Sequence, residues 1–214
     1  DLIYNITFPY DITMYENIPK CVFFTSEFRD YLTKDYFLIA KPPDFSDDYI
    51  KTYLSQFTNI FFTSPSDWSH QGILKYCSRD RIITHGVDTT IFKPDKSNRN
   101  YLRSKYNVNE SDILLMCIGA MTTNKGILLI LQLMYILVCK LKKTHFKLLL
   151  KGTGDLYKCK EFLNEYTKVL LNNGISQSDI DLLYDNYFIF TDSTISFSNL
   201  NQLYNASDLY ISPY

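Results

Sequence analysis

The residues of this chain whose types and spacing could support chemistry gather in one loop between a buried strand and an apolar helix. An apolar run at 113–118 predicts the strand, Gly119 follows it, and Lys125 and Gly126 come where the helix is expected to begin. Gly119 has no side chain, so a ligand can approach the backbone there. The free N–H groups of a first helical turn favour an anion. The loop therefore predicts a site for the phosphates of a nucleotide ligand.

Lys125 is the informative residue of this loop, because a helix disfavours a cation at its start. With Asn124 as the expected N-cap, Lys125 would oppose the helix dipole by roughly 0.3–1 kcal/mol. At the other end of the same helix, Lys140, Lys142 and Lys143 stand where cations are favoured. We interpret Lys125 as a phosphate ligand, and the sequence leaves a solvated surface lysine equally open.

Two known phosphate loops do not fit the chain. A Walker A loop needs its lysine after the second glycine and then a hydroxyl residue, whereas Lys125 precedes Gly126. A dinucleotide fingerprint needs three glycines, and after Gly152 and Gly154 the third position is occupied by Tyr157. A lone G-x-G is equally compatible with an ordinary strand-to-helix turn. An NAD-type oxidoreductase is therefore a disfavoured alternative.

Strands and helices that alternate along the chain must position this loop. Strands are expected at 2–6, 21–25, 36–40, 59–64, 81–84, 113–119, 146–151, 187–191 and 208–212. Helices are expected at 46–56, 65–76, 99–106, 125–142, 155–172, 176–184 and 198–206. Such alternation, with continuously apolar strands, predicts parallel sheets covered by helices. Linker chemistry at 91–98 divides the chain in two, and the lack of a closing helix after 208–212 predicts a fragment cut at both ends.

Short motifs follow one another in a distinctive order between residues 59 and 214. They are FTSPSDWS at 62–69, RIITHGVDTTIFKP at 81–94, GAMTTNKG at 119–126, KGTGD at 151–155, FT at 190–191 and LYNASDLYISP at 203–213. Each motif is weak alone, and their common order makes them specific together. In this order they resemble the signatures of retaining GT-B glycosyltransferases of the group 1, or family-four, type.

The resemblance implies an α/β protein of the GT-B class, with two Rossmann-like doubly wound domains that are both truncated here. Residues 1–90 would be the C-terminal part of the N-terminal, acceptor-side domain, 91–98 the interdomain linker, and 99–214 the first part of the donor-binding domain. The activity implied is hexosyl transfer from a nucleotide-diphosphate sugar to an acceptor, with retention of configuration and without a metal or other cofactor.

The resemblance also implies which residues bind substrate. Lys125 would contact the diphosphate of the donor, and the loop around Ser193 and Thr194 would lie near its base. The substrate-binding set is Gly119, Ala120, Lys125, Gly152, Gly154, Ser193 and Thr194. No catalytic residue is assigned.

The chain departs from the family pattern at several points. Ala120 stands where the family has an arginine, which removes a charged hydrogen bond of about 1.5–3 kcal/mol. A family histidine of the N-terminal half is replaced by Ser26, beside Glu27, and the E-x7-E motif would follow Tyr214. The alternative is therefore a catalytically inactive nucleotide-sugar-binding or scaffold fragment derived from such an enzyme.

Composition excludes several other classes. A net charge of −1 provides no basic face for nucleic acid. The longest apolar run, 127–139, is shorter than the ~18 residues of a bilayer span, and we see no signal peptide. The 5 cysteines and 3 histidines form no zinc pattern, and Asp179 and Asp181 fit a helix's first turn better than a metal site. We expect a cytoplasmic protein with reduced thiols and no resident metal; its oligomeric state is not predictable from these features.

Overall fold

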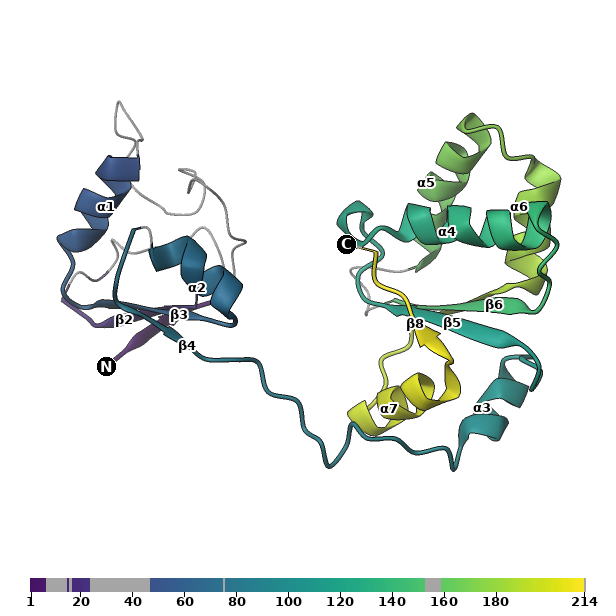
Figure 1. The fold of residues 1–214 in the computed structure, drawn as a ribbon, viewed down its shortest axis with the longest axis horizontal. Coiled ribbons are helices and arrows are strands. Elements are labelled where there is room, and N and C mark those ends of the chain that lie inside the picture. Colours follow the sequence, from purple (N-terminus) through teal and green to yellow (C-terminus); the bar gives the residue numbers. More distant parts are fainter. Residues whose placement is uncertain (7–14, 16, 24–46, 75, 153–158, 214) are drawn as a thin grey trace. The chain divides into compact units, whose positions relative to one another are not determined.

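The computed structural model describes residues 1–6, 15, 17–23, 47–74, 76–152 and 159–213. The chain divides into two compact units, Asp1–Val87 and Asp88–Tyr214. Each unit contains its own four-stranded parallel sheet, shown in Figure 1, and each is described by itself.

The sheet of the first unit has the strand order β1-β2-β3-β4. Its strands are β1 (Ile3–Asn5), β2 (Lys20–Phe23), β3 (Ile60–Ser64) and β4 (Asp80–Ile82), with helices α1 (Asp47–Ser55) and α2 (Asp67–Leu74). Val22 and Phe62 from the strands, Leu54 from α1 and Ile73 from α2 are fully buried. The strand predicted at 36–40, together with Ser26 and Glu27, lies outside the described residues.

A buried carboxylate joins helix α2 to this sheet. Asp80 at the start of β4 accepts a hydrogen bond of 2.9 Å from the hydroxyl of Ser64 on β3. The same carboxylate oxygen contacts Nδ1 of His70 on α2. Because Asp80 is 2% exposed, these two contacts take the place of water at Oδ2, whereas Oδ1 is buried without a hydrogen-bond partner among the described residues.

The second unit alternates strands and helices around the sheet order β7-β6-β5-β8. In chain order the elements are α3 (Arg99–Lys105), β5 (Ile113–Ile118), the 3₁₀ turn η1 (Thr123–Lys125), α4 (Ile127–Tyr135), the π-helical η2 (Ile136–Lys140), β6 (Phe146–Lys151), α5 (Cys159–Asn172), α6 (Gln177–Asn186), β7 (Phe188–Thr191), α7 (Phe197–Ala206) and β8 (Leu209–Tyr210). All pairings are parallel. The predicted α/β class is therefore confirmed.

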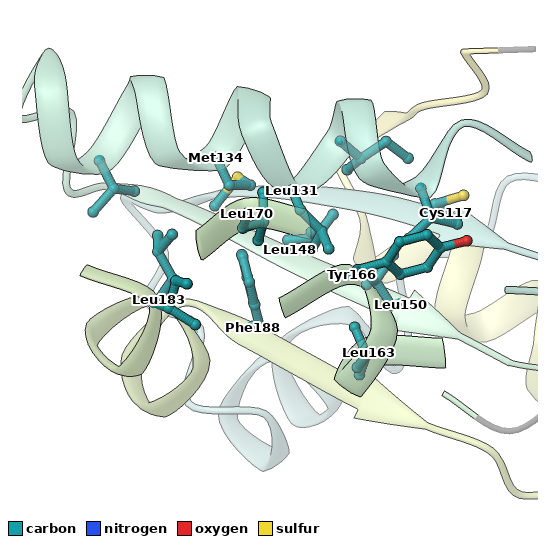
Figure 2. Packing of buried hydrophobic residues seen from close by; sticks show 14 of the residues in the cluster. Cys117, Leu131, Met134, Leu148, Leu150, Leu163, Tyr166, Leu170, Leu183 and Phe188 are labelled. Atoms are coloured by element: carbon teal, nitrogen blue, oxygen red, sulfur yellow. The ribbon is translucent and has the colours of Figure 1, made fainter. Parts of the chain in front are cut away.

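Helices cover both faces of this second sheet. Alternate strand residues point to opposite faces, so Leu148 and Leu150 of β6 pack under α4, α5 and α6, as Figure 2 shows. Leu149 belongs to a separate cluster with Met116 of β5 and Leu203 of α7. In Figure 1, α3 and α7 accordingly lie on the face opposite α4, α5 and α6.

An ionic junction fixes β8 and α3 at the amino edge of this sheet. The carboxylate of Asp208 accepts from the backbone N–H of Leu114 at 2.8 Å and from the guanidinium of Arg103 at 2.9 Å, and it also pairs with Arg99. Burial alone would raise the pKa of Asp208, but the Leu114 N–H and the two arginines hold the pKa below its ordinary value. Arg103 itself is buried and donates to three backbone carbonyl oxygens besides.

The helix predicted at 125–142 differs from the observed one at both ends. Helix α4 begins at Ile127 and its N-cap is Gly126, in the left-handed region at φ +64°, so the prediction of Asn124 as N-cap is wrong. Residues Thr123–Lys125 form a separate 3₁₀ turn. The last part of the predicted helix, Ile136–Lys140, is π-helical. Among the described helices, none is long and apolar enough to span a membrane.

Candidate functional site

The carboxyl edge of the second sheet gathers the loops that carry the predicted site. All four strands are parallel, so Gly119 after β5, Gly152 after β6 and the residues after Thr191 on β7 meet at one edge. The sheet order reverses at β5, because β6 and β7 follow on one side whereas β8 lies on the other. Ligands of open α/β sheets bind outside the carboxyl ends at such a switch point.

Backbone hydrogen bonds continue past the strand ends and hold these loops together. The N–H of Gly119 donates to the carbonyl of Lys151 at 3.1 Å, and the N–H of Gly152 donates to that of Thr191 at 2.9 Å. Gly119 has φ +141°, and no described atom lies within 4 Å of where a Cβ would be. The glycine is therefore needed for its backbone conformation, and it leaves open space beside the backbone at the end of β5.

Lys125 ends the 3₁₀ turn rather than beginning helix α4. Its N–H donates to the carbonyl of Thr122 at 3.0 Å, and its side chain is half-buried. Burial raises the pKa of the Cys117 thiol, and the positive charge of Lys125 opposes that rise. The charge of Lys125 therefore lies near the last residues of β5. The argument from the helix dipole does not apply in its original form, because Gly126 separates Lys125 from α4.

The loop after β8 packs directly on the loop after β5. A Cβ built on Gly126 would lie 2.6 Å from Cγ of Pro213. The N–H of Ile211 donates to the carbonyl of Met116 at 2.8 Å and extends the β8 pairing toward this contact. The two loops at the switch point are thus in van der Waals contact at Gly126.

The remaining predicted residues that the structure describes lie along the same edge. Ala120 is half-buried and gives the loop no charge. Ser193 and Thr194 follow β7 and are exposed, with the Ser193 hydroxyl 3.3 Å from that of Thr191. Because neighbouring strands are about 4.8 Å apart, β7 is roughly 10 Å from β5. A ligand that contacts both loops must cross β6. Gly154 lies outside the described residues.

A pocket of about 220 Å³ opens beside Thr191 and Ser193. Ile195 and Asn199 also line it, and α3 contributes Tyr101 among other residues. No local pattern in the sequence indicates this pocket, because α3 and β7 are distant in the chain. A larger hollow of about 340 Å³, beside Arg103 and Asn109, lies toward the amino edge of the sheet, away from the predicted residues.

Lys151 is a further charged residue at this edge that the sequence-based prediction missed. It ends β6, is 5% exposed, and its ammonium donates to the carbonyl of Gly152 at 2.6 Å. The sequence feature that could have indicated Lys151 is a lysine at the end of an apolar strand. In the part of the chain that the structure describes, no three His, Cys, Asp or Glu residues are grouped to hold a metal ion.

Comparisons with known proteins find similarity in structure only. No protein-family model and no curated protein matches the sequence. An α,α-trehalose 6-phosphate synthase from Burkholderia multivorans is 14% identical with a TM-score of 0.62, covering 98% of this chain and 50% of that one. A UDP-forming α,α-trehalose-phosphate synthase from Burkholderia xenovorans is 13% identical with a TM-score of 0.62, covering 98% and 52%. The N-terminal domain of a trehalose-6-phosphate phosphatase from Candida albicans is 12% identical with a TM-score of 0.57, covering 99% and 50%.

This likeness establishes the fold. At such identities it supports the GT-B class, with two Rossmann-like units, and leaves the activity to be argued from the site. The chain spans about half the length of these structures.

Proposed function

We propose that this chain is part of a retaining glycosyltransferase that moves a hexose from a nucleotide-diphosphate sugar to an acceptor. The observation that carries the proposal is the carboxyl edge of the second sheet. There the open backbone at Gly119 and the charge of Lys125 adjoin the switch point between β5 and β8. The GT-B fold is compatible with this activity, and two of the similar structures are described as synthases of trehalose phosphate.

The donor's diphosphate would lie over the loop after β5. Gly119 allows close approach to the backbone, and Lys125 provides a point charge for the phosphate oxygens. The nucleoside would then extend across β6 toward Ser193 and Thr194, and the first unit would bind the acceptor. In this proposal the charge of Lys125, rather than a metal ion, stabilises the leaving diphosphate.

A second candidate is a nucleotide-sugar-binding protein without catalysis. Ala120 favours it, because a loop that lacks one cation stabilises the charge of a departing diphosphate less well. The two candidates share the ligand and differ in turnover. Release of UDP or GDP from the matching nucleotide hexose, with retained configuration in the product, would support the enzyme. Binding of the nucleotide without any turnover would support the second candidate.

Calorimetric titration of the chain with UDP and GDP tests the shared part of both proposals. We expect binding of one nucleotide, and a loss of about tenfold or more in affinity for Lys125→Ala, the scale of one charged hydrogen bond. Lys143→Ala is the matched control, because Lys143 is exposed beyond the far end of η2. No heat at millimolar nucleotide from a folded protein would refute the proposal.

A further inference from the structure

A buried lysine at the end of β6 is not explained by the fold. Lys151 is 5% exposed, and its ammonium donates to the carbonyl of Gly152 at 2.6 Å. An ammonium has three donors, and among the residues that the structure describes this carbonyl is its one acceptor and no carboxylate pairs with it. A buried charge of this kind is costly unless an anion completes its environment.

The other buried cation of this unit differs from Lys151 in its partners. Arg103 is 4% exposed, and its guanidinium pairs with the carboxylate of Asp208 and donates to three backbone carbonyls. Its environment is complete within the protein. Among the described residues Lys151 has one neutral acceptor, so its environment there is incomplete by comparison.

The position of Lys151 indicates which anion could pair with it. Its register neighbours are Ile118 on β5 and Thr191 on β7. The contact with Gly152 places the ammonium beyond the last residue of β6, at the carboxyl edge. It therefore lies between the loop of Gly119 and the residues that follow Thr191, on the line that a nucleotide would take across the edge.

We infer that Lys151 binds a phosphate of the nucleotide ligand and supplies the second cation that Ala120 does not provide. This inference rests on the proposed function. The carbonyl of Gly152 holds the ammonium of Lys151 at the edge. The other two N–H groups of that ammonium donate to phosphate oxygens. Two lysines, Lys125 in the turn after β5 and Lys151 at the end of β6, then flank the diphosphate.

The test compares two lysines of the same strand. Lys151→Met removes the charge and keeps much of the length and apolar volume of the side chain. Lys147→Met is the matched control: Lys147 lies four residues earlier, on the same face of β6, and its ammonium donates to the carbonyl of Asn186 at the amino edge. Calorimetric titrations of each variant with UDP and with uridine separate the phosphate contribution from that of the nucleoside.

We expect Lys151→Met to weaken the affinity for UDP at least tenfold and the affinity for uridine by less than twofold. Lys147→Met should change neither affinity. We also expect Lys151→Met without ligand to unfold at the same or a higher urea concentration than the original chain, because a costly buried charge is gone. Unchanged UDP affinity in Lys151→Met, with UDP binding intact in the original chain, overturns this inference and leaves the proposed function standing. Equal losses of affinity for UDP and uridine in Lys151→Met, with a lower unfolding midpoint, also overturn the inference, because such losses indicate that Lys151 has a structural role. No UDP binding by the original chain overturns both.

Discussion

Substitution of Gly126 by alanine tests the contact between the two loops at the switch point. Gly126 has φ +64°, and an added Cβ would lie 2.6 Å from Cγ and 3.3 Å from Cβ of Pro213. Gly174→Ala is the control variant, because Gly174 has φ +81° and no described atom lies within 4 Å of the Cβ position. Gly174→Ala therefore measures the cost of backbone strain alone. Gly126→Ala has a similar backbone strain and in addition the steric collision with Pro213.

The two contributions can be estimated separately. The left-handed conformation costs an alanine roughly 1–2 kcal/mol, and the reduced entropy of the unfolded chain returns about 0.4–1 kcal/mol. We therefore expect Gly174→Ala to lower the free energy of unfolding by roughly 0–1.5 kcal/mol. Carbon atoms prefer separations of about 3.5–4.0 Å, so Pro213 must move by roughly 1 Å in Gly126→Ala. Because Pro213 is exposed, the collision should cost near the lower end of the overpacking range, so Gly126→Ala should destabilise by about 1 kcal/mol more than Gly174→Ala does.

Hydrogen exchange of the β5 and β6 amides, measured under conditions that report opening free energies, gives the stability of the second unit. Trp68, the single tryptophan, lies in the first unit, so its fluorescence reports the unfolding of that unit. The unfolding midpoint measured in this way should be the same in both glycine variants and in the original chain. The Pro213→Ala change removes Cγ and leaves the looser contact of 3.3 Å with Cβ, so the difference between Gly126→Ala and Gly174→Ala should shrink in that background. If the two glycine variants already agree within about 0.3 kcal/mol with Pro213 present, the contact has no energetic role and the reasoning is refuted.

Three further predictions concern charge. Asp208→Asn should destabilise the second unit by roughly 1–2 kcal/mol at neutral pH, because it weakens the junction with the two arginines while its partly exposed site limits the loss. Since the pKa of Asp208 is lowered in the folded state, its contribution to the free energy of unfolding is present above about pH 4, the unfolded value, and is lost as pH falls through the folded pKa. Amide exchange measured as a function of pH in the acid range should show this loss of stability in the original chain and a smaller loss in Asp208→Asn. Asp80→Ala leaves two polar partners unpaired and should destabilise the first unit by about 3 kcal/mol, seen as an earlier Trp68 transition in urea, whereas an unchanged midpoint would contradict the buried junction. Addition of EDTA should leave UDP affinity unchanged in calorimetry, and a large loss would refute the metal-independent site.

The sequence predicted the central strands well because their signal is local. The apolar runs at 113–118 and 146–151 became β5 and β6 with matching bounds. The start of α4 was predicted incorrectly because its cause is not local: Gly126 adopts the left-handed conformation where the loop after β8 packs on it. A helix rule applied to residues 124–126 contains no information about Pro213.

The site was predictable to the extent that parallel strands bring their carboxyl ends to one edge. That rule places Gly119, Gly152 and Ser193 together from the order of strands alone. It could not identify Lys151, because a lysine after three leucines is expected to reach solvent. Lys151 becomes a buried charge only when β5 and β7 pair on its two sides.

The order of groups along the edge also favours one direction for the proposed ligand. Lys125 adjoins β5, Lys151 ends β6, and the pocket of about 220 Å³ beside Thr191 and Ser193 follows at β7. Two lysines thus stand at one end of the line, and the opposite end has hydroxyl, amide and aromatic groups suited to a base, with Lys105 as its one lysine among the lining residues. A nucleotide with its phosphates at β5 satisfies both ends, whereas the reverse orientation would leave two lysines beside an uncharged base. For the same reason, the affinity for uridine should not depend on either lysine. The affinities for UMP and then UDP should depend increasingly on both lysines, because each added phosphate contributes charged hydrogen bonds.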